Sequence, residues 1–161
     1  MHKNAEVIEK FYQAFQTRNY VDMMACYHEQ IEFQDPAFHL KGKEAGAMWH
    51  MLCEQALALK IEFSGVEADD TTGKAHWEAY YPFSLTKREV HNIIDASFEF
   101  KEGKIIKHTD VFDFWRWSRQ ALGVPGLALG LSSFLQNKVR QQAGKNLKKF
   151  MAKHPEYQIT E

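Results

Sequence analysis

The hydrophobic period of this chain changes near residue 60, and that change limits the possible folds more than any other feature. Before it, apolar residues recur at helical spacing in three segments, 4–17, 20–28 and 43–57. After it, apolar and polar residues alternate in four segments separated by turn sequences, 61–69, 74–85, 90–100 and 104–117. Helices followed by consecutive strands predict an α+β fold, with N-terminal helices packed in a strongly curved, mainly antiparallel sheet. Asn4 is expected to cap the first helix.

One more strand is predicted between the second and third helices. In the sequence IEFQD, Ile31, Phe33 and Asp35 lie on one face of an alternating segment. Pro36 follows directly and has no amide hydrogen, so the strand ends or bends there. We therefore expect Asp35 to lie at the mouth of a pocket enclosed by the sheet. The alternative is a purely structural role, because Asp before Pro is a common turn sequence.

The chain after residue 117 predicts a C-terminal helix over 132–152, behind a break rich in glycine and proline. Residues 132–154 carry six basic side chains and no acidic one, which is typical of the solvated face of a helix; contact with an anionic surface is the alternative. The apolar sequence between the break and this helix is expected to cover core through Leu127, Leu129, Leu131 and Phe134.

Chain length and net charge limit the number of domains and the kind of partner. A chain of 161 residues is expected to form one domain, which we divide into residues 1–117 and a helical extension of the same domain, 118–161. The formal net charge of −1 argues against nucleic acid as the main partner. Aromatic residues reach 14%, and such side chains form cores or line ligand pockets.

Other functional classes find little support. Cys26 and Cys53 have no metal-binding or redox spacing and are expected to be buried thiols in a reducing compartment, which predicts a cytoplasmic protein. Charges interrupt the apolar runs of the N-terminus, so no signal peptide is predicted, and no apolar stretch is long enough to span a membrane. We predict no metal site and no cofactor, because neither metal-ligand spacing nor a glycine-rich phosphate loop is present.

The sequence KHTDVFDFWRW, residues 107–117, places ionisable side chains inside an aromatic, strand-like run. His108 and Asp110 alternate onto one face, which Ile106 and Phe112 continue. An aspartate and an imidazole facing an apolar cavity form a candidate acid–base pair. The alternatives are a polar pair hydrogen-bonded within the sheet, or a one-residue slip in register that turns Asp113 inward instead.

The order of these elements resembles the nuclear transport factor 2-like superfamily, and within it the SnoaL-like proteins, which include polyketide cyclases and ketosteroid isomerases. The resemblance covers about residues 4–117 and is carried by three segments, YHEQIEFQDPAF, IIDASFEFKEGKIIKHTDVFD and FWRWSRQALG. It implies a cystatin-like cone whose sheet curls around the helices and leaves an apolar cavity. It also implies a homodimer paired through the outer face of the sheet.

The resemblance to ketosteroid isomerases is incomplete. Asp35-Pro36 matches the position of their general base. Their oxyanion hole needs a tyrosine on the first helix and an acid on the penultimate strand, and the matching positions here are Phe11 and Ala96. Tyr12 is the neighbour of the first position, about 100° round the helix. Isomerisation of the steroid type is therefore not expected.

The resemblance to SnoaL-type cyclases implies that Asp110, on the last strand, takes a proton from an activated carbon. Those enzymes also use a histidine on the preceding strand, for which His91 is a partial match. With His108 and Asp35, Asp110 completes the predicted catalytic set. The cavity is expected to be lined by six aromatic residues, Phe11, Phe15, Phe33, Trp49, Phe98 and Phe112.

Three functions stay open from the sequence. The first is a cofactor-free isomerase, cyclase or hydratase acting on a small apolar carbonyl compound. The second is a non-catalytic binding protein for a lipid-like or aromatic ligand. The third is a dimeric interaction module that uses residues 118–154 as a docking arm.

Overall fold

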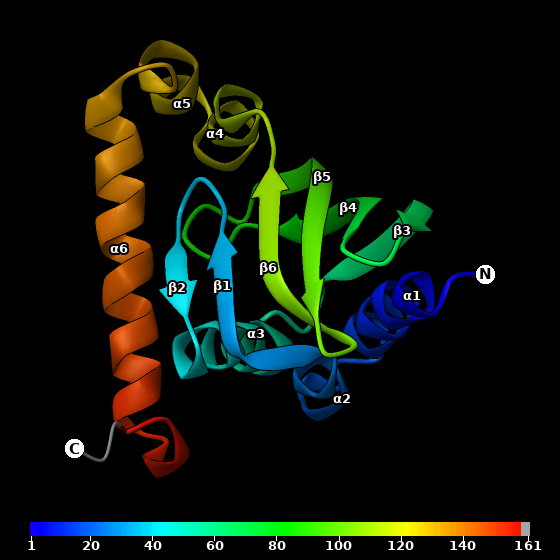
Figure 1. Ribbon diagram of the computed structural model, residues 1–161. Helices are drawn as coiled ribbons and strands as arrows, with labels where there is room; N and C mark the ends of the chain where they lie inside the picture. Colours follow the sequence, from blue (N-terminus) through cyan, green and yellow to red (C-terminus); the bar gives the residue numbers. More distant parts are fainter. Residues whose placement is uncertain (159–161) are drawn as a thin grey trace.

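The computed structural model describes residues 1–158 and contains one six-stranded sheet in the order β2-β1-β6-β5-β4-β3 (Figure 1). The strands are β1 (Tyr27–Gln34), β2 (His39–Lys41), β3 (Lys60–Ala68), β4 (Thr72–Pro82), β5 (Glu89–Lys101) and β6 (Lys104–Val111). The helices are α1 (Lys3–Gln16), α2 (Tyr20–Ala25), α3 (Lys43–Gln55), α4 (Phe114–Leu122), α5 (Val124–Leu129), α6 (Ser133–Ala152) and the short η1 (Pro155–Tyr157). The predicted α+β fold is confirmed.

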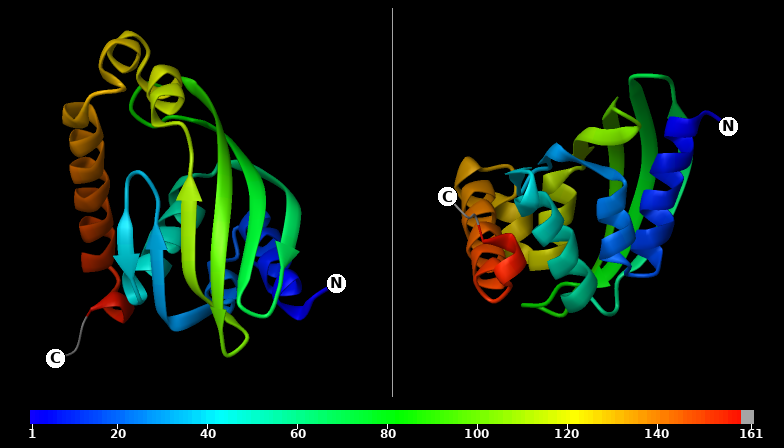
Figure 2. Two further views of the ribbon diagram at one scale, coloured as in Figure 1. Left: turned by 45° about the horizontal axis from the view of Figure 1, so that its top comes forward. Right: turned by 60° about the horizontal axis from the view of Figure 1, so that its bottom comes forward.

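The sheet is strongly curved and does not close. Strand β1 runs parallel to β6, and every other neighbouring pair of strands is antiparallel. Figure 2 shows α1 and α3 on the concave side, so the apolar faces of both helices meet the inward side chains of the strands. The result is the predicted cone, with its core between the helices and the sheet.

A bulge in β6 changes which residues face the core. Glu99 of β5 pairs with Lys107, whereas its neighbour Phe100 pairs with Ile105, so Ile106 is the extra residue. Ile105 is fully buried and Ile106 only partly, which corrects the expectation that Ile106 shares the inward face. Beyond the bulge the alternation resumes and both His108 and Asp110 point inward, so the register is not slipped.

The last strand is shorter than predicted. It ends at Val111, and residues 114–122 form helix α4 because Asp113 caps it, its side chain accepting the amide hydrogen of Arg116 at 3.0 Å. Asp113 is thus exposed at a helix start, outside the cone. At the N-terminus, His2 caps α1, and Asn4 instead donates to the carbonyls of Asp69 and Asp70.

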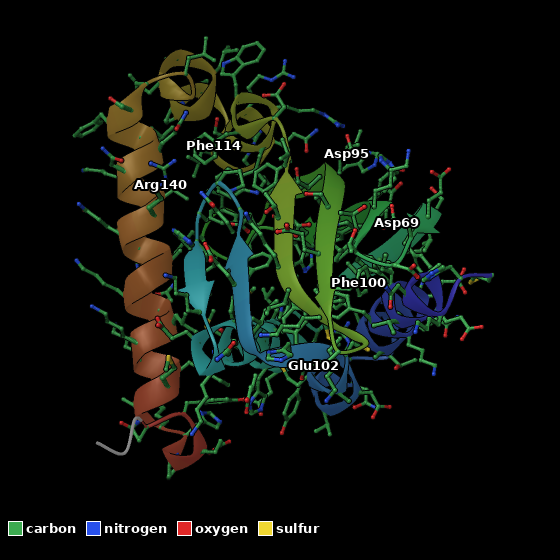
Figure 3. The ribbon with its side chains drawn as sticks, viewed as in Figure 1. Asp69, Asp95, Phe100, Glu102, Phe114 and Arg140 are labelled. Carbon is green, nitrogen blue, oxygen red and sulfur yellow. The ribbon has the colours of Figure 1, made fainter. Side chains whose placement is uncertain are left out.

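The three C-terminal helices cover one end of the cone and one edge of the sheet. Helix α4 packs where β1, β4 and β6 end, and its Phe114 and Trp117 form a second apolar cluster with Val90 (Figure 3). Helix α6 runs alongside β2, and Nε of Arg140 donates to the carbonyl of Pro36 at 2.9 Å (Figures 1 and 3). Within residues 1–158, none of the helices is long and apolar enough to cross a membrane.

The apolar residues between α4 and α6 do not cover core, contrary to expectation. All four are exposed, Leu127, Leu129, Leu131 and Phe134. The helix α5 makes its close contact through Gly126, which lies against the backbone of Ser118 with no room for a side chain. Because α5 packs through this glycine, its larger apolar side chains point to solvent. The inward face of α6 is supplied instead by Leu147 and Phe150, as its period predicts.

Candidate active site

A continuous chain of hydrogen-bonded side chains crosses the interior of the cone. Its members, in order, are Trp49, Tyr27, His108, Asp110 and Trp77. The indole N–H of Trp49 donates to Oη of Tyr27 at 2.9 Å, and that oxygen lies 2.7 Å from Nδ1 of His108. Nε2 of His108 lies 2.9 Å from Oδ1 of Asp110, which also accepts the indole N–H of Trp77 at 3.3 Å. Every link joins buried groups.

One arrangement of hydrogens satisfies the whole chain. Since Tyr27 accepts from Trp49, its own O–H is free to donate to Nδ1 of His108. The remaining ring nitrogen then carries the hydrogen and donates to Asp110. The imidazole is thereby held as its Nε2–H tautomer, and Oδ1 of Asp110 receives two donors. Among residues 1–158 none donates to the other oxygen, Oδ2 of Asp110.

Aromatic rings enclose this chain on several sides. His108 has an exposed fraction of 0% and Asp110 of 3%. The rings of Phe98 and Phe33 lie 4.5 and 5.0 Å from the imidazole, and Phe11 lies 5.5 Å away, all measured between centroids. Two surface hollows, of about 610 and 480 Å³, lie near the β5–β6 turn, and no member of the chain lines either. His108 and Asp110 are therefore enclosed by protein, with almost no exposed surface.

Asp35 lies beside this site at the end of β1. Its Oδ1 accepts the amide hydrogens of Ala37 and Phe38, both at 2.7 Å, so the carboxylate also shapes the turn into β2. Burial, and secondarily the negative charge of Asp110, raise the pKa of Asp35 to about 6, although the two amide donors oppose the shift. The group thus titrates close to neutral pH, where it can either give or take a proton.

Tyr12 carries an unpaired hydroxyl inside the cone. The residue is fully buried, its ring stacks on Phe63 and lies 6.0 Å from the ring of Trp77. Within the described residues its Oη has no hydrogen-bond partner. Burial raises the pKa of the Tyr12 hydroxyl well above its ordinary value, and the charge of Asp110 adds to the shift. A buried hydroxyl without a partner costs about 1–3 kcal/mol, so its retention calls for a reason.

The SnoaL-like domain matches residues 8–108, which is most of the cone. The chain belongs to this family. Among curated proteins, none matches the chain. Family membership agrees with the fold and leaves the reaction undefined.

Several solved structures share the fold of this SnoaL-like chain at low sequence identity, and one of them is described as NTF2-like. A putative polyketide cyclase from Xanthomonas campestris has a TM-score of 0.62 and 16% identity, over 73% of this chain and 96% of the other. An epoxide hydrolase of M. tuberculosis has a TM-score of 0.59 and 17% identity, over 83% and 95% of the two chains. A protein of unknown function from Burkholderia pseudomallei has a TM-score of 0.64 and 13% identity, over 76% and 99%.

In this SnoaL-like cone, the aromatic residues predicted to line a cavity fall into two groups. Five of them are buried: Trp49 belongs to the hydrogen-bonded chain itself, and the other four pack around it, Phe11, Phe15, Phe33 and Phe98. Phe112 is half-buried and contacts both the main core and the cluster under α4, so it lies at the covered end of the cone. His91 does not join them, because it faces outward and its Nε2 lies 2.6 Å from Glu78.

Three members of the site escaped the sequence analysis. Tyr27 fell in the predicted second helix, but that helix ends at Ala25 and Tyr27 begins β1 facing inward. Trp77 lies in the predicted strand 74–85, and its indole N–H proves to be a donor to Asp110. For Tyr12 the helical period near Phe11 could indicate burial only. Buried Trp and Tyr side chains generally need a hydrogen-bond partner, so their presence in core segments could have indicated a buried polar site.

Proposed function

We propose that this SnoaL-like protein catalyses a cofactor-free proton transfer on a small apolar carbonyl compound. The observation that carries the proposal is the buried hydroxyl of Tyr12, which has no hydrogen-bond partner among residues 1–158. It lies in the same interior as Asp110, whose hydrogen bonds from described residues all go to Oδ1. A buried donor without a partner, beside a carboxylate oxygen that accepts no hydrogen bond, is an arrangement that a bound enolisable molecule would satisfy.

The roles follow from the contacts. Asp110 takes the proton from the carbon beside the carbonyl through Oδ2, while His108 and Trp77 hold Oδ1 and fix the carboxylate. Tyr12 donates to the carbonyl oxygen as negative charge develops there, which replaces the oxyanion donors that the sequence lacks. Asp35, with its pKa raised to about 6, returns a proton at the other end of the molecule.

We propose that a ligand enters at the end of the cone that α4 covers. Asp35, Phe112 and Tyr81 are half-buried there, whereas His108 is fully enclosed. The polyketide cyclase and epoxide hydrolase among the structural neighbours share the cone and support a small-molecule site of this kind.

The test is proton exchange, which needs no knowledge of the final product. The full chain is incubated in D₂O with 2-tetralone or cyclohex-2-enone, and loss of the α-proton signal is followed by NMR. We expect the parent protein to accelerate exchange, and Asp110→Asn and Tyr12→Phe each to reduce the acceleration at least about 100-fold. Asp95→Asn, on the outer face of β5, is the matched control and is expected to keep the parent rate.

Absence of acceleration by the parent, or an Asp110→Asn variant as fast as the parent, would contradict the proposal. The second candidate is ligand binding without chemistry, favoured by the aromatic enclosure of His108. It predicts that 2-tetralone quenches the fluorescence of the buried Trp49 and Trp77 without any exchange. The homodimer through the sheet, the cytoplasmic location and the division of the chain at residue 117 stay predictions.

A further inference from the structure

A second cluster of titratable groups lies outside the cone, where α3 meets the segment after α6. His50 and Glu54 are one turn apart on α3, and Nε2 of His50 lies 2.8 Å from Oε1 of Glu54. His154 follows the end of α6. One ligand atom from each of these three residues lies within 4.8 Å of the others. The chain thus brings two imidazoles and a carboxylate together from positions about 100 residues apart.

The two imidazoles are held in the orientation that a metal ligand needs. Nδ1 of His154 lies 2.7 Å from the carbonyl of Phe150, so it carries the hydrogen and leaves Nε2 as the free nitrogen. Nδ1 of His50 lies 2.6 Å from Oη of Tyr157, which can accept as well as donate. These contacts are the outer-shell bonds that fix the tautomer and raise the basicity of metal-ligating histidines.

Aromatic stacking further restricts both rings. Tyr20 stacks on His50 with centroids 3.6 Å apart, and Phe150 stacks on His154 at 4.0 Å. His50 is 2% exposed, whereas the side chain of Glu54 is 50% exposed. The cluster is therefore tightly packed on its protein side and open to solvent at Glu54, which provides a route for an ion and room for a water ligand.

We propose that His50, Glu54 and His154 bind one Zn²⁺ ion, with water in the fourth position. Two histidines and a carboxylate with one open position are a known zinc ligand set. Ligand atoms of a tetrahedral zinc site lie about 3.3 Å apart. The His50–Glu54 pair, at 2.8 Å, therefore has to open slightly, and the longest separation in the cluster, up to 4.8 Å, has to close. His50 then carries its hydrogen on Nδ1 and donates it to Tyr157, while Nε2 turns its lone pair to the metal.

Zinc at this point would connect α3 to the C-terminal segment. Because the ligands come from both sides of that junction, the folded chain binds the ion and the unfolded chain does not hold it in the same way. At a free concentration about 100 times the dissociation constant, zinc is expected to raise Tm by about 5–10 °C. The proposal departs from the sequence prediction that the chain has no metal site, and it is independent of the proposed proton transfer.

The experiment uses the full, untagged chain after treatment with a chelator. Calorimetric titration with Zn²⁺ is expected to give one site of micromolar or tighter affinity, and Co²⁺ at the same site an absorption spectrum of tetrahedral coordination. His154→Gln and Glu54→Gln are expected to weaken zinc binding more than about 100-fold, and Tyr157→Phe about tenfold. His39→Gln is the control, because His39 pairs with Glu32 at 2.7 Å without belonging to this cluster.

His154 and Glu54 are partly or fully exposed, so their variants are expected to fold, which circular dichroism checks. The proposal is overturned if the parent binds no zinc, or if the His154→Gln and Glu54→Gln chains bind it as tightly as the parent. Loss of binding in the His39→Gln control also overturns it, since the ion would then lie elsewhere.

Discussion

The same three-residue arrangement occurs twice in this protein, once inside the cone and once outside it. In each case a tyrosine hydroxyl contacts Nδ1 of a histidine whose Nε2 contacts a carboxylate. The inner triplet is Tyr27–His108–Asp110 and the outer triplet is Tyr157–His50–Glu54. Their distances agree closely, 2.7 and 2.9 Å in the inner triplet against 2.6 and 2.8 Å in the outer one.

What differs is the surroundings of the carboxylate. Asp110 is buried and receives a second donor from Trp77, whereas Glu54 is half-exposed and has His154 beside it. A buried carboxylate that has one oxygen hydrogen-bonded and the other free can take a proton in a site without water. A solvent-facing carboxylate near a second imidazole can share a cation. The two triplets therefore have the same local geometry but support different chemistry, because one carboxylate is buried and the other faces solvent.

The largest expected effect is on stability when the carboxylate is removed. Asp110→Ala leaves the N–H groups of His108 and Trp77 buried without a partner and is expected to cost about 3–5 kcal/mol of unfolding free energy. Glu54→Ala removes a half-exposed carboxylate that pairs with the buried His50 on the same helix, and is expected to cost about 0.5–1.5 kcal/mol. Urea unfolding followed by circular dichroism measures both, and equal losses would show that the two triplets do not differ in this way.

Removing the tyrosine hydroxyl should also destabilise the protein more in the inner triplet than in the outer one. Tyr27→Phe deprives Trp49 of its acceptor and His108 of its donor in the core, with an expected loss of about 2–3 kcal/mol. Tyr157→Phe acts on a contact that is partly open to water and should cost about 0.5–1 kcal/mol. Chemical unfolding of the two variants beside the parent is the measurement, and a larger loss in Tyr157→Phe would reverse the comparison.

Asp35 extends the comparison to pH. Its pKa is raised to about 6 in the folded chain from an ordinary value of 3.8, so between these values the folded state binds more protons than the unfolded state. The stability contributed by this group is therefore lost as pH rises from about 4 to about 6. Asp35→Asn keeps an oxygen acceptor for the amides of Ala37 and Phe38 but does not titrate. The difference in unfolding free energy between the variant and the parent should therefore shift in favour of the variant by about 2 kcal/mol from pH 4 to pH 7.5. A pH-independent difference between the two chains would contradict this.

The smallest effect distinguishes the two buried tyrosines of the cone. Tyr12→Phe removes a hydroxyl that has no partner, so the unfolding free energy should stay equal or rise by up to about 1 kcal/mol, in contrast to Tyr27→Phe. Thermal unfolding provides the comparison. A clear loss of stability in Tyr12→Phe would mean that its hydroxyl is paired in solution, and the proposed proton-transfer site would lose its donor.

Much of the fold was predictable because it depends on short-range patterns. The switch of hydrophobic period predicted the order of helices and strands, and alternation turned His108 and Asp110 to the same face as in the structure. Asn19 caps α2 and Gly42 precedes α3, as their residue types indicate. The aromatic run after Val111 misled, because its β-propensity outweighed the cap at Asp113 and the helical spacing of Phe114, Trp117 and Ala121.

The sequence by itself determined the order of the main helices and strands and, for the most part, which face of each is apolar, but it did not reveal β2, α4 or α5. Only the tertiary structure decided which polar groups meet: that Tyr27 reaches His108 across 81 positions, that Tyr12 has no partner, and that His154 lies beside His50. The reason is physical. Local period and capping depend on neighbours within a few residues, whereas these contacts depend on sheet curvature, on the bulge at Ile106 and on where α6 ends.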